Sequence, residues 1–418
     1  MKEYFFTLFL RGSSLAARFF LVFFLAKFFN LNLYGIYGVI VAFIGYGIYL
    51  IGFDFYAYST REMISSTPDK WGGMIYSHLF FGFLIIILFS PLLFFLYKKN
   101  IIPEKYFFYF FFILFLEWLN QELMRILIAT KDPLSASIAY FIRSALWIFF
   151  IVIVFLLFEN SRKLEFLFFS WIFFDAFAIA YVINQLIKNG VSFNNVFFDW
   201  RWVLKGVKVS LLFFIGTLCL RGVSTFDRYY ISEFLSYEKT AIYVLFSGLS
   251  GALQIILDAG VFTFLYPRLI SSFNDGDFKK FNAILKKIIF SVILISFSFS
   301  LALYSSIDVF LNLINKNIYR DNIEILWYCL LCNIIWAFSM IFHYPIYAFN
   351  KDRVIFFSHA TGLVTFLVVL GLNMGSNSLV IVPLAVAFSF SIVLFIKAIF
   401  FFVTKKRLEK DFSMLRDK

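Results

Sequence analysis

The chain has 418 residues, of which 62% are hydrophobic and only 15% are charged, and Phe alone contributes 65. A typical soluble domain is about half apolar and about a quarter charged, which argues against a soluble enzyme, a disordered chain and a disulfide scaffold. The mean hydropathy of +0.87 predicts an all-α, polytopic membrane protein. The net charge of +12 fits Lys and Arg at a cytoplasmic membrane face better than nucleic-acid binding.

Twelve helices are predicted by cutting the chain at charge clusters, prolines and turn residues. A span needs about 20 mostly apolar residues to cross the bilayer, and each segment meets this length. The predicted ranges are 5–29, 36–58, 72–97, 104–129, 134–158, 164–187, 203–225, 239–266, 282–306, 322–349, 353–373 and 378–403. The segments between them are short, so we expect no separate soluble domain.

Basic residues predict the orientation of these spans. If the N-terminus is cytoplasmic, the inner segments contain 22 of the 37 Lys and Arg residues and the outer segments contain 10. Because cytoplasmic loops carry an excess of Lys and Arg, we expect both termini in the cytoplasm.

A weak internal repeat links the two halves of the chain. Three short matches keep their order, and each falls in the equivalent loop of a six-helix half. They pair 35–37 with 241–243, 61–66 with 268–272, and Lys131-Asp132 with Lys351-Asp352. We therefore expect an N-terminal six-helix lobe at 1–190 and a C-terminal lobe at 191–418, which ends in a short basic cytoplasmic tail.

Three arginines interrupt the predicted spans of the first half: Arg11, Arg18 and Arg143. An ionisable group inside a span usually faces a partner or a cavity. These arginines could pair with buried acids and hold the bundle together, or they could line a cavity and bind an anionic substrate, because Arg presents fixed donors to phosphate. In the second half no charge is expected at mid-depth, since Asp258 and Lys397 lie near the inner span ends.

Two acids, Glu117 and Asp175, are predicted near mid-depth of the first half. A carboxylate in low dielectric either has a partner or tends to hold a proton. One reading makes them permanent partners of Arg18 and Arg143. The other makes them candidates for exchanging a proton or Na⁺ during transport.

No motif indicates catalysis, a cofactor or a metal. The chain has no Walker A, H-E-x-x-H or G-x-S-x-G sequence. Cys329-x-x-Cys332 falls in an apolar stretch and is read as two small residues on one helix face, and the three His residues are scattered. We expect no enzyme, and transport energy would come from an ion or substrate gradient.

Several segments resemble the polysaccharide flippases, specifically the O-antigen (Wzx-type) branch of the multidrug/oligosaccharidyl-lipid/polysaccharide exporter superfamily. The similar segments are 33–37, Gly52-Phe53-Asp54 with Arg61-Glu62, Phe226-Asp227-Arg228-Tyr229-Tyr230-Ile231-Ser232 with Ala241-Ile242-Tyr243, and 266–268 with 275–277. The segment at 226–232 resembles the connection between helices seven and eight of that family. Ala241 stands where the family usually has Gly.

The resemblance implies twelve helices in two lobes around a central cavity. It implies translocation of an undecaprenyl-diphosphate-linked oligosaccharide across the bacterial inner membrane by alternating access, with polysaccharide-assembly proteins as possible partners. Its motif residues here are Asp54, Arg61, Asp227 and Arg228. Depth and charge, rather than a family motif, make Arg11, Arg18 and Arg143 candidate substrate contacts.

Two other functions stay open. An ion-coupled drug exporter of the related toxin-extrusion type would share the lobed plan. A membrane polysaccharide polymerase or glycosyltransferase would also be apolar and many-helix, although polymerases tend to carry a large external loop, which this sequence lacks.

Overall fold

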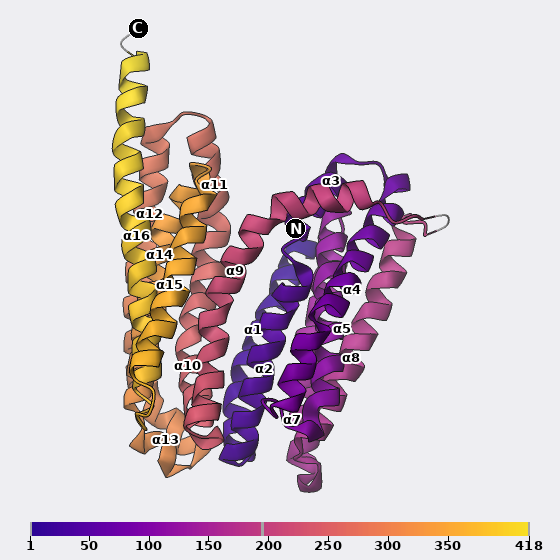
Figure 1. Cartoon of the computed structure of the whole chain (residues 1–418), viewed down its shortest axis with the longest axis vertical. Helices are drawn as coiled ribbons and strands as arrows, with labels where there is room; N and C mark the ends of the chain where they lie inside the picture. Colours follow the sequence, from indigo (N-terminus) through magenta and orange to yellow (C-terminus); the bar gives the residue numbers. More distant parts are fainter. Residues whose placement is uncertain (1, 194–195, 417–418) are drawn as a thin grey trace. The chain divides into compact units, whose positions relative to one another are not determined.

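A computed structural model describes residues 2–193 and 196–416 and shows an all-helical chain over these residues (Figure 1). Packing divides it into two compact units, Met1–Phe214 and Ile215–Lys418. The helices of the first unit are α1 (Lys2–Phe28), α2 (Leu31–Gly52), α3 (Tyr56–Ser65), α4 (Pro68–Lys98), α5 (Glu104–Ala129), α6 (Pro133–Phe141), the π-helical turn η1 (Ile142–Leu146), α7 (Trp147–Leu157), the 3₁₀ turn η2 (Glu159–Ser161) and α8 (Leu164–Lys188).

The second unit is reached through α9 (Trp200–Phe234), within which the division between the units falls. Its further helices are α10 (Tyr237–Leu257), the π-helical turn η3 (Asp258–Phe262), α11 (Thr263–Asn274), α12 (Phe278–Ile314), α13 (Asn317–Asp321), α14 (Glu324–Ala348), α15 (Asp352–Leu372) and α16 (Ile381–Arg416).

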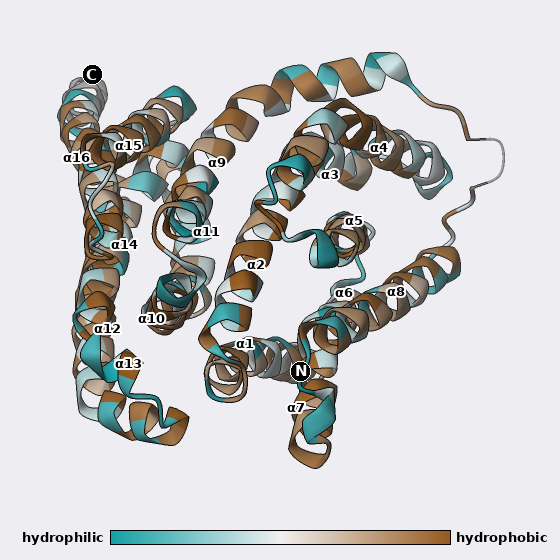
Figure 2. Ribbon diagram, turned by 60° about the horizontal axis from the view of Figure 1, so that its bottom comes forward, coloured by the Kyte–Doolittle hydropathy of each residue, from teal (hydrophilic) through white to brown (hydrophobic). Residues whose placement is uncertain are grey.

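The predicted polytopic membrane protein is confirmed. Among the described residues, eleven helices are long and apolar enough to cross a membrane. The twelfth predicted span, α5, is continuous but falls outside that set, because it carries several charged residues. It packs against α2, α4, α6 and α8, so neighbouring helices surround it (Figure 2). A helix in this inner position can hold charges without exposing them to lipid.

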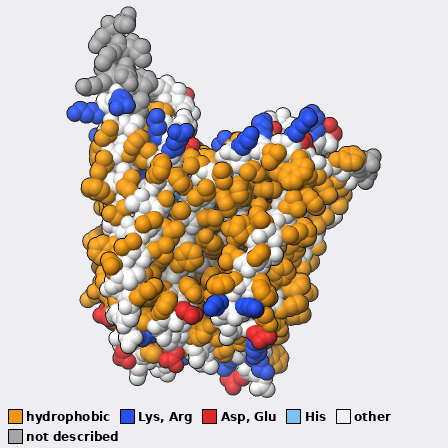
Figure 3. Space-filling model, in the orientation of Figure 1, with side chains coloured by type: hydrophobic (Ala, Val, Ile, Leu, Met, Phe, Trp, Pro, Cys, Tyr) orange, Lys and Arg blue, Asp and Glu red, His pale blue; other side chains and the backbone are white. Residues whose placement is uncertain are grey.

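The surface matches this membrane assignment. Hydrophobic side chains cover the flanks of the helices in Figure 3, whereas Lys, Arg, Asp and Glu gather toward the helix ends. Many large side chains on these flanks are exposed, among them Phe108, Phe169 and Phe297. In a bilayer such side chains contact lipid at no cost, because lipid tails are as apolar as they are.

The end of α2 differs from the prediction of a helix over 36–58. The helix stops at Gly52, because Phe53 and Asp54 both adopt left-handed backbone conformations, with φ of 54° and 48°. Two consecutive non-glycine residues in this region are uncommon. The chain then continues as the separate helix α3, so Asp54 lies in a break between helices rather than inside a span.

The predicted boundary near residue 190 also differs from the observed division. The first turns of α9 pack on unit 1, where Gly206 lies directly against the rings of Phe55 and Tyr58, and Lys205 pairs with Glu62 at 3.4 Å. These contacts place residues 200–214 with the first unit. The motif at 226–232 is helical, within α9, and is not a connection between helices.

Equivalent turns in the two units are built alike, but the predicted matches differ from them in detail. The first two matches lie within helices rather than loops, and Lys131 corresponds to Asn350 rather than to Lys351. Asn30 caps α2 by accepting a hydrogen bond from Leu33 N, and Ser236 caps α10 by accepting one from Lys239 N. The turns that follow α5 and α14 each place one residue in the left-handed region, Lys131 and Asn350. Both turns close with hydrogen bonds to carbonyls three and five residues back, as in a Schellman cap.

Candidate functional site

Arg11 and Arg18 lie seven residues apart on one face of α1, as their spacing predicts. Arg11 Nε donates to Ser137 Oγ at 3.2 Å, and Arg18 Nη2 donates to Ser144 Oγ at 2.8 Å. Both serines lie on the adjacent segment formed by α6 and η1, again seven residues apart. The guanidinium of Arg18 also lies 5.5 Å from the Tyr140 ring centroid. Two parallel contacts therefore fix both arginines against one neighbouring helix.

The two α1 arginines are exposed and, within the described chain, neither has a carboxylate within ion-pair distance. Arg18 is ten residues from the end of α1 at Phe28, which places it about 15 Å along the helix. Serine satisfies only part of a guanidinium, which has five N–H donors. The remaining donors suit the oxygens of a phosphate or carboxylate.

Arg143 is different, because it is buried and paired. Its guanidinium forms a salt bridge with Glu117 Oε2, and Trp171 Nε1 donates to the other oxygen of that carboxylate at 2.8 Å. Arg143 is 6% exposed and Glu117 is 3% exposed. The Trp171 ring stacks on Trp147 with centroids 5.1 Å apart. In this conformation, Arg143 and Glu117 neutralise each other's charge and are not available to a substrate or a coupling ion.

A π-helical turn sets the direction of Arg143. The turn η1 spans Ile142–Leu146 and interrupts the helix formed by α6 and α7. A π-turn inserts an extra residue into the helical ladder, and such turns are frequent at functional sites. Here Ser144 of this turn contacts Arg18, while Arg143 contacts Glu117 on α5. One short segment thus joins α1 to the central helix α5.

Asp175 on α8 differs from Glu117 and Arg143, because its side chain is not paired with any described residue. Its side chain is 0% exposed, and neither carboxylate oxygen has a hydrogen-bond partner among the described residues. Its backbone carbonyl accepts a hydrogen bond from Asn120 Nδ2 at 3.0 Å. A buried, unsatisfied carboxylate is costly when ionised. The geometry therefore suits protonation or a bound cation at Asp175, whereas Glu117 is held by Arg143.

A second buried cluster in unit 1 centres on Glu122. His78 Nε2 lies 3.4 Å from Glu122 Oε2, and Arg125 Nη1 donates to Glu122 Oε1 at 2.7 Å. His78 Nδ1 lies 3.1 Å from Ser59 Oγ, and the Arg125 guanidinium lies 3.6 Å from the Tyr56 ring centroid. The spacing of Glu122 and Arg125 predicts their pairing, but only the approach of α3 and α4 brings the other residues to them.

The motif residues of unit 1 do not join the arginine site. Asp54 is buried in the break after α2, and Arg61 is exposed on α3. Asp54 lies between α2 and α3, and Arg61 lies within α3. Their assignment as family-motif residues stays a prediction.

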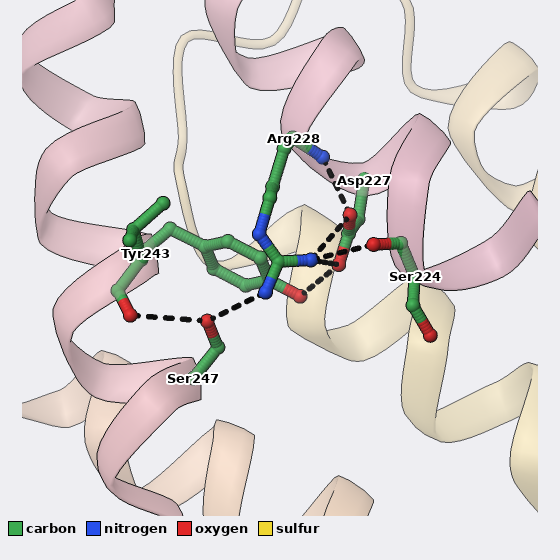
Figure 4. A network of polar contacts seen from close by, with 6 residues as sticks. Ser224, Asp227, Arg228, Tyr243 and Ser247 are labelled. Carbon is green, nitrogen blue, oxygen red and sulfur yellow. Dashed lines mark hydrogen bonds and ion pairs between the residues drawn. The ribbon is translucent and has the colours of Figure 1, made fainter. Parts of the chain in front are cut away.

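Asp227 and Arg228 form a saturated network with α10 (Figure 4). Tyr243 donates its hydroxyl to Asp227 Oδ2 at 2.8 Å, and Arg228 Nη1 lies 3.2 Å from Asp227 Oδ1. Arg228 also donates to the Ser224 carbonyl at 2.6 Å and to Ser247 Oγ at 3.2 Å. Because the acceptors of Asp227 are occupied from both helices, this network fixes α9 against α10.

Unit 2 also contains a polar cluster that the sequence pattern does not reveal. The side chains of Lys397 and His359 are in contact, and the rings of His359 and His343 lie parallel. The expectation that the histidines are scattered is therefore wrong for these two. Cys329 and Cys332 are buried free cysteines, and no group of three or more metal-ligating His, Cys, Asp or Glu residues occurs in the part of the chain that the structure describes.

Comparisons with known proteins give structural matches only. No protein-family model matches the chain, and no curated protein matches it. Three solved structures illustrate the structural likeness. An inward-facing multidrug resistance MATE family transporter of the MOP superfamily matches with a TM-score of 0.74 at 10% identity, covering 95% of both chains. An outward-facing structure of such a transporter matches at 0.58 and 10% identity, covering 96% of this chain and 94% of the other.

A MATE transporter from Vibrio cholerae matches with a TM-score of 0.59 at 14% identity, covering 98% of this chain and 97% of that one. At these identities the likeness concerns the fold. It extends over nearly the whole length of each chain. The protein is a multi-pass membrane protein with the fold of the MATE transporters of the MOP superfamily.

Proposed function

We propose that the chain transports an anionic, lipid-linked oligosaccharide across the bacterial inner membrane by alternating access. The specific substrate we propose is an undecaprenyl-diphosphate-linked O-antigen repeat unit. The single observation that carries this proposal is the pair of exposed arginines, Arg11 and Arg18, within a membrane-spanning helix.

An exposed arginine within a membrane span needs polar surroundings. Exposure of Arg18 to hydrocarbon is costly, so its guanidinium should face a water-accessible path. Both arginines hold neutral serines rather than acids, so their positive charge is not cancelled at contact distance. A diphosphate that crosses the bilayer needs positive charge nearby to compensate its own negative charge, whereas its apolar polyprenyl tail can stay in the hydrocarbon.

Arg143, Glu117 and Asp175 have different roles in this proposal. Arg143 positions η1, and through it Ser144, while Glu117 neutralises Arg143. Asp175 has no hydrogen-bond partner for its carboxylate among the described residues and is the better candidate of the two acids for holding a coupling proton or cation.

A second candidate is an ion-coupled drug exporter. It is favoured by the fold comparison, since the matching structures include multidrug resistance transporters. The chemistry of α1 separates the candidates, because Arg11 and Arg18 attract anions and repel a cationic drug. The flippase proposal therefore rests on this local charge, because the fold alone is compatible with both candidate functions.

The test is complementation of a strain that lacks its O-antigen flippase. We expect Arg18→Ala to reduce surface polysaccharide by about 10–100-fold, because charge-assisted hydrogen bonds contribute about 1.5–3 kcal/mol. Lys27→Ala is the matched control, since Lys27 is an exposed basic residue in the last turn of the same helix and should leave export unchanged.

Membrane abundance of each variant is measured by immunoblotting. Failure of the abundant wild-type chain to restore polysaccharide would reject the flippase. If that chain instead extrudes a cationic dye from vesicles, the drug-exporter candidate replaces it. Full export by Arg18→Ala at normal abundance would remove the arginine from the substrate path.

A further inference from the structure

A buried lysine in unit 2 lies at the meeting point of three helices. Lys397 on α16 is 0% exposed, and its Nζ lies 3.1 Å from Nε2 of His359 on α15. The ammonium also lies 5.2 Å from the ring centroid of Trp336 on α14. Because α16 packs along both α14 and α15, the fold itself holds these side chains together.

The hydrogen bonds define how many protons the pair can hold. His359 Nδ1 lies 3.3 Å from the carbonyl oxygen of Gly216 on α9. A carbonyl only accepts, so Nδ1 carries the hydrogen, and Nε2 of the neutral ring presents a lone pair. Lys397 donates to that lone pair when it is an ammonium. A second proton on His359 would require a neutral amine at Lys397, so the pair carries one positive charge at most.

No acid balances this charge. The groups that face Lys397 are His359 from α15, His343 and Trp336 from α14, and no carboxylate contacts it among the described residues. The acid Asp258 of η3 interacts with Arg221 of α9 instead. An ammonium that is out of water and lacks a counter-ion costs free energy, whereas the neutral amine does not.

His343 extends the cluster toward the end of α14. Its ring lies parallel to that of His359, with centroids 6.1 Å apart and an interplanar angle of 7°. His343 is half-buried, and its Nδ1 has no hydrogen-bond partner within the described segments. It lies five residues before the end of α14 at Ala348, or about 8 Å from that end.

We propose that Lys397, His359 and His343 form a proton-binding site that loads and releases one proton in each transport cycle. Loading leaves an ammonium at Lys397 beside a neutral His359. Release breaks one N–H bond of that ammonium and gives the proton to water when the transport cycle exposes the pair, which leaves a neutral amine beside a neutral imidazole. The inference rests on the proposed transport function and places the coupling ion, H⁺, at Lys397 rather than at Asp175.

The same geometry argues against other ligands. Lys397 is fully buried, so a phosphate or a lipid headgroup cannot contact it in this conformation. Na⁺ is a hard cation that prefers oxygen ligands, whereas the cluster presents nitrogen atoms and a positive charge. A proton needs no additional volume.

A substrate-free titration tests proton binding directly. The purified full chain is titrated in detergent while tryptophan fluorescence is followed, because the Lys397 charge lies over Trp336. We expect a single-proton transition in the wild type that is absent in Lys397→Met and in Trp336→Phe. Lys351→Met, in the exposed turn between α14 and α15, is the matched control and should keep the transition. An identical transition in Lys397→Met would overturn the site.

Coupling is tested in proteoliposomes with a polyprenyl-diphosphate-linked disaccharide. With one coupled proton, a pH difference of one unit should shift the final distribution of this lipid about tenfold, since one pH unit corresponds to 1.36 kcal/mol. We expect Lys397→Met and Lys397→Arg to equilibrate the lipid without any shift. Arg is the second variant because it keeps the charge but does not release a proton.

The outcomes separate the two proposals. If the wild type moves the lipid but ignores the pH difference, or if both variants keep the tenfold shift, the proton site is wrong and the transport function stands. If the wild type moves no lipid, the transport function fails, and the fluorescence titration alone decides the site.

Discussion

Asp175 in unit 1 and Lys397 in unit 2 are both 0% exposed, and neither has an oppositely charged partner within ion-pair distance among the described residues. Their neighbourhoods are opposite in kind. Asp175 adjoins a core in which Glu117 and Arg143 are already paired, whereas Lys397 adjoins two histidines. The two units thus each bury an ionisable group without an ion-pair partner among the described residues, an acid in unit 1 and a base in unit 2.

Backbone features are repeated more faithfully than these charges. The caps at Asn30 and Ser236 and the left-handed turns at Lys131 and Asn350 occupy equivalent places in the two units. Every helix end must satisfy its backbone groups, particularly in a membrane, so this chemistry recurs wherever the scaffold recurs. The fold does not require a buried ionisable group in the same way, and the two units bury different ones.

The connection between the second and third spans shows the same divergence. In unit 1 the helix breaks at Phe53 and Asp54, whereas in unit 2 the π-helical turn η3 carries α10 directly into α11. In both units, the regular α-helix is interrupted near the same end of the span. The first leaves a separate short helix, and the second keeps the helix continuous.

The largest effect should come from breaking the paired charges of unit 1. Arg143→Ala leaves Glu117 buried without its partner, which should lower the free energy of unfolding by about 3–5 kcal/mol. Lys397→Met in unit 2 should cost much less, because it leaves no unpaired charge behind. Denaturant unfolding in detergent measures both. Equal losses for the two variants would contradict the claim that only Arg143 leaves a buried, unpaired acid behind when it is removed.

A smaller contrast compares two buried aspartates. Asp227→Asn weakens acceptors used by Tyr243 and Arg228 and should lower the free energy of unfolding by about 1.5–3 kcal/mol. Asp175→Asn should cause no loss, because its carboxylate oxygens have no hydrogen-bond partners among the described residues. Thermal unfolding of each variant in detergent distinguishes them, and a loss at Asp175 that matches the loss at Asp227 would mean that Asp175 is satisfied after all.

The smallest effect tests the equivalence of the two units. Asn30→Ala and Ser236→Ala each remove one side-chain cap, so each should lower the free energy of unfolding by about 1 kcal/mol. Ser305→Ala, on the exposed face of α12, is a control outside the caps and should change stability little. A clear loss at only one cap would show that the repeated turns are not energetically alike.

The sequence by itself determined the membrane class, the all-helical architecture and, among the described residues, eleven of the twelve predicted spans. The reason is that hydrocarbon provides no hydrogen bonds, so an apolar segment of this length must satisfy its own backbone as a helix. The spacing of Arg11 and Arg18 also placed them on one face. The match of α5 to its predicted range, 104–129, follows from the turn residues at both of its ends.

Only the tertiary structure decided which charges are paired. The serine partners of Arg11 and Arg18, the pairing of Arg143 with Glu117 and the isolation of Asp175 depend on how helices distant in sequence approach one another. Lys397 illustrates the same point. The prediction that it lies near a span end is wrong, because α16 runs from Ile381 to Arg416 and its apolar span continues to Arg407. Its histidine neighbours come from two other helices, and local spacing along one helix carries no information about side chains that another helix brings into contact.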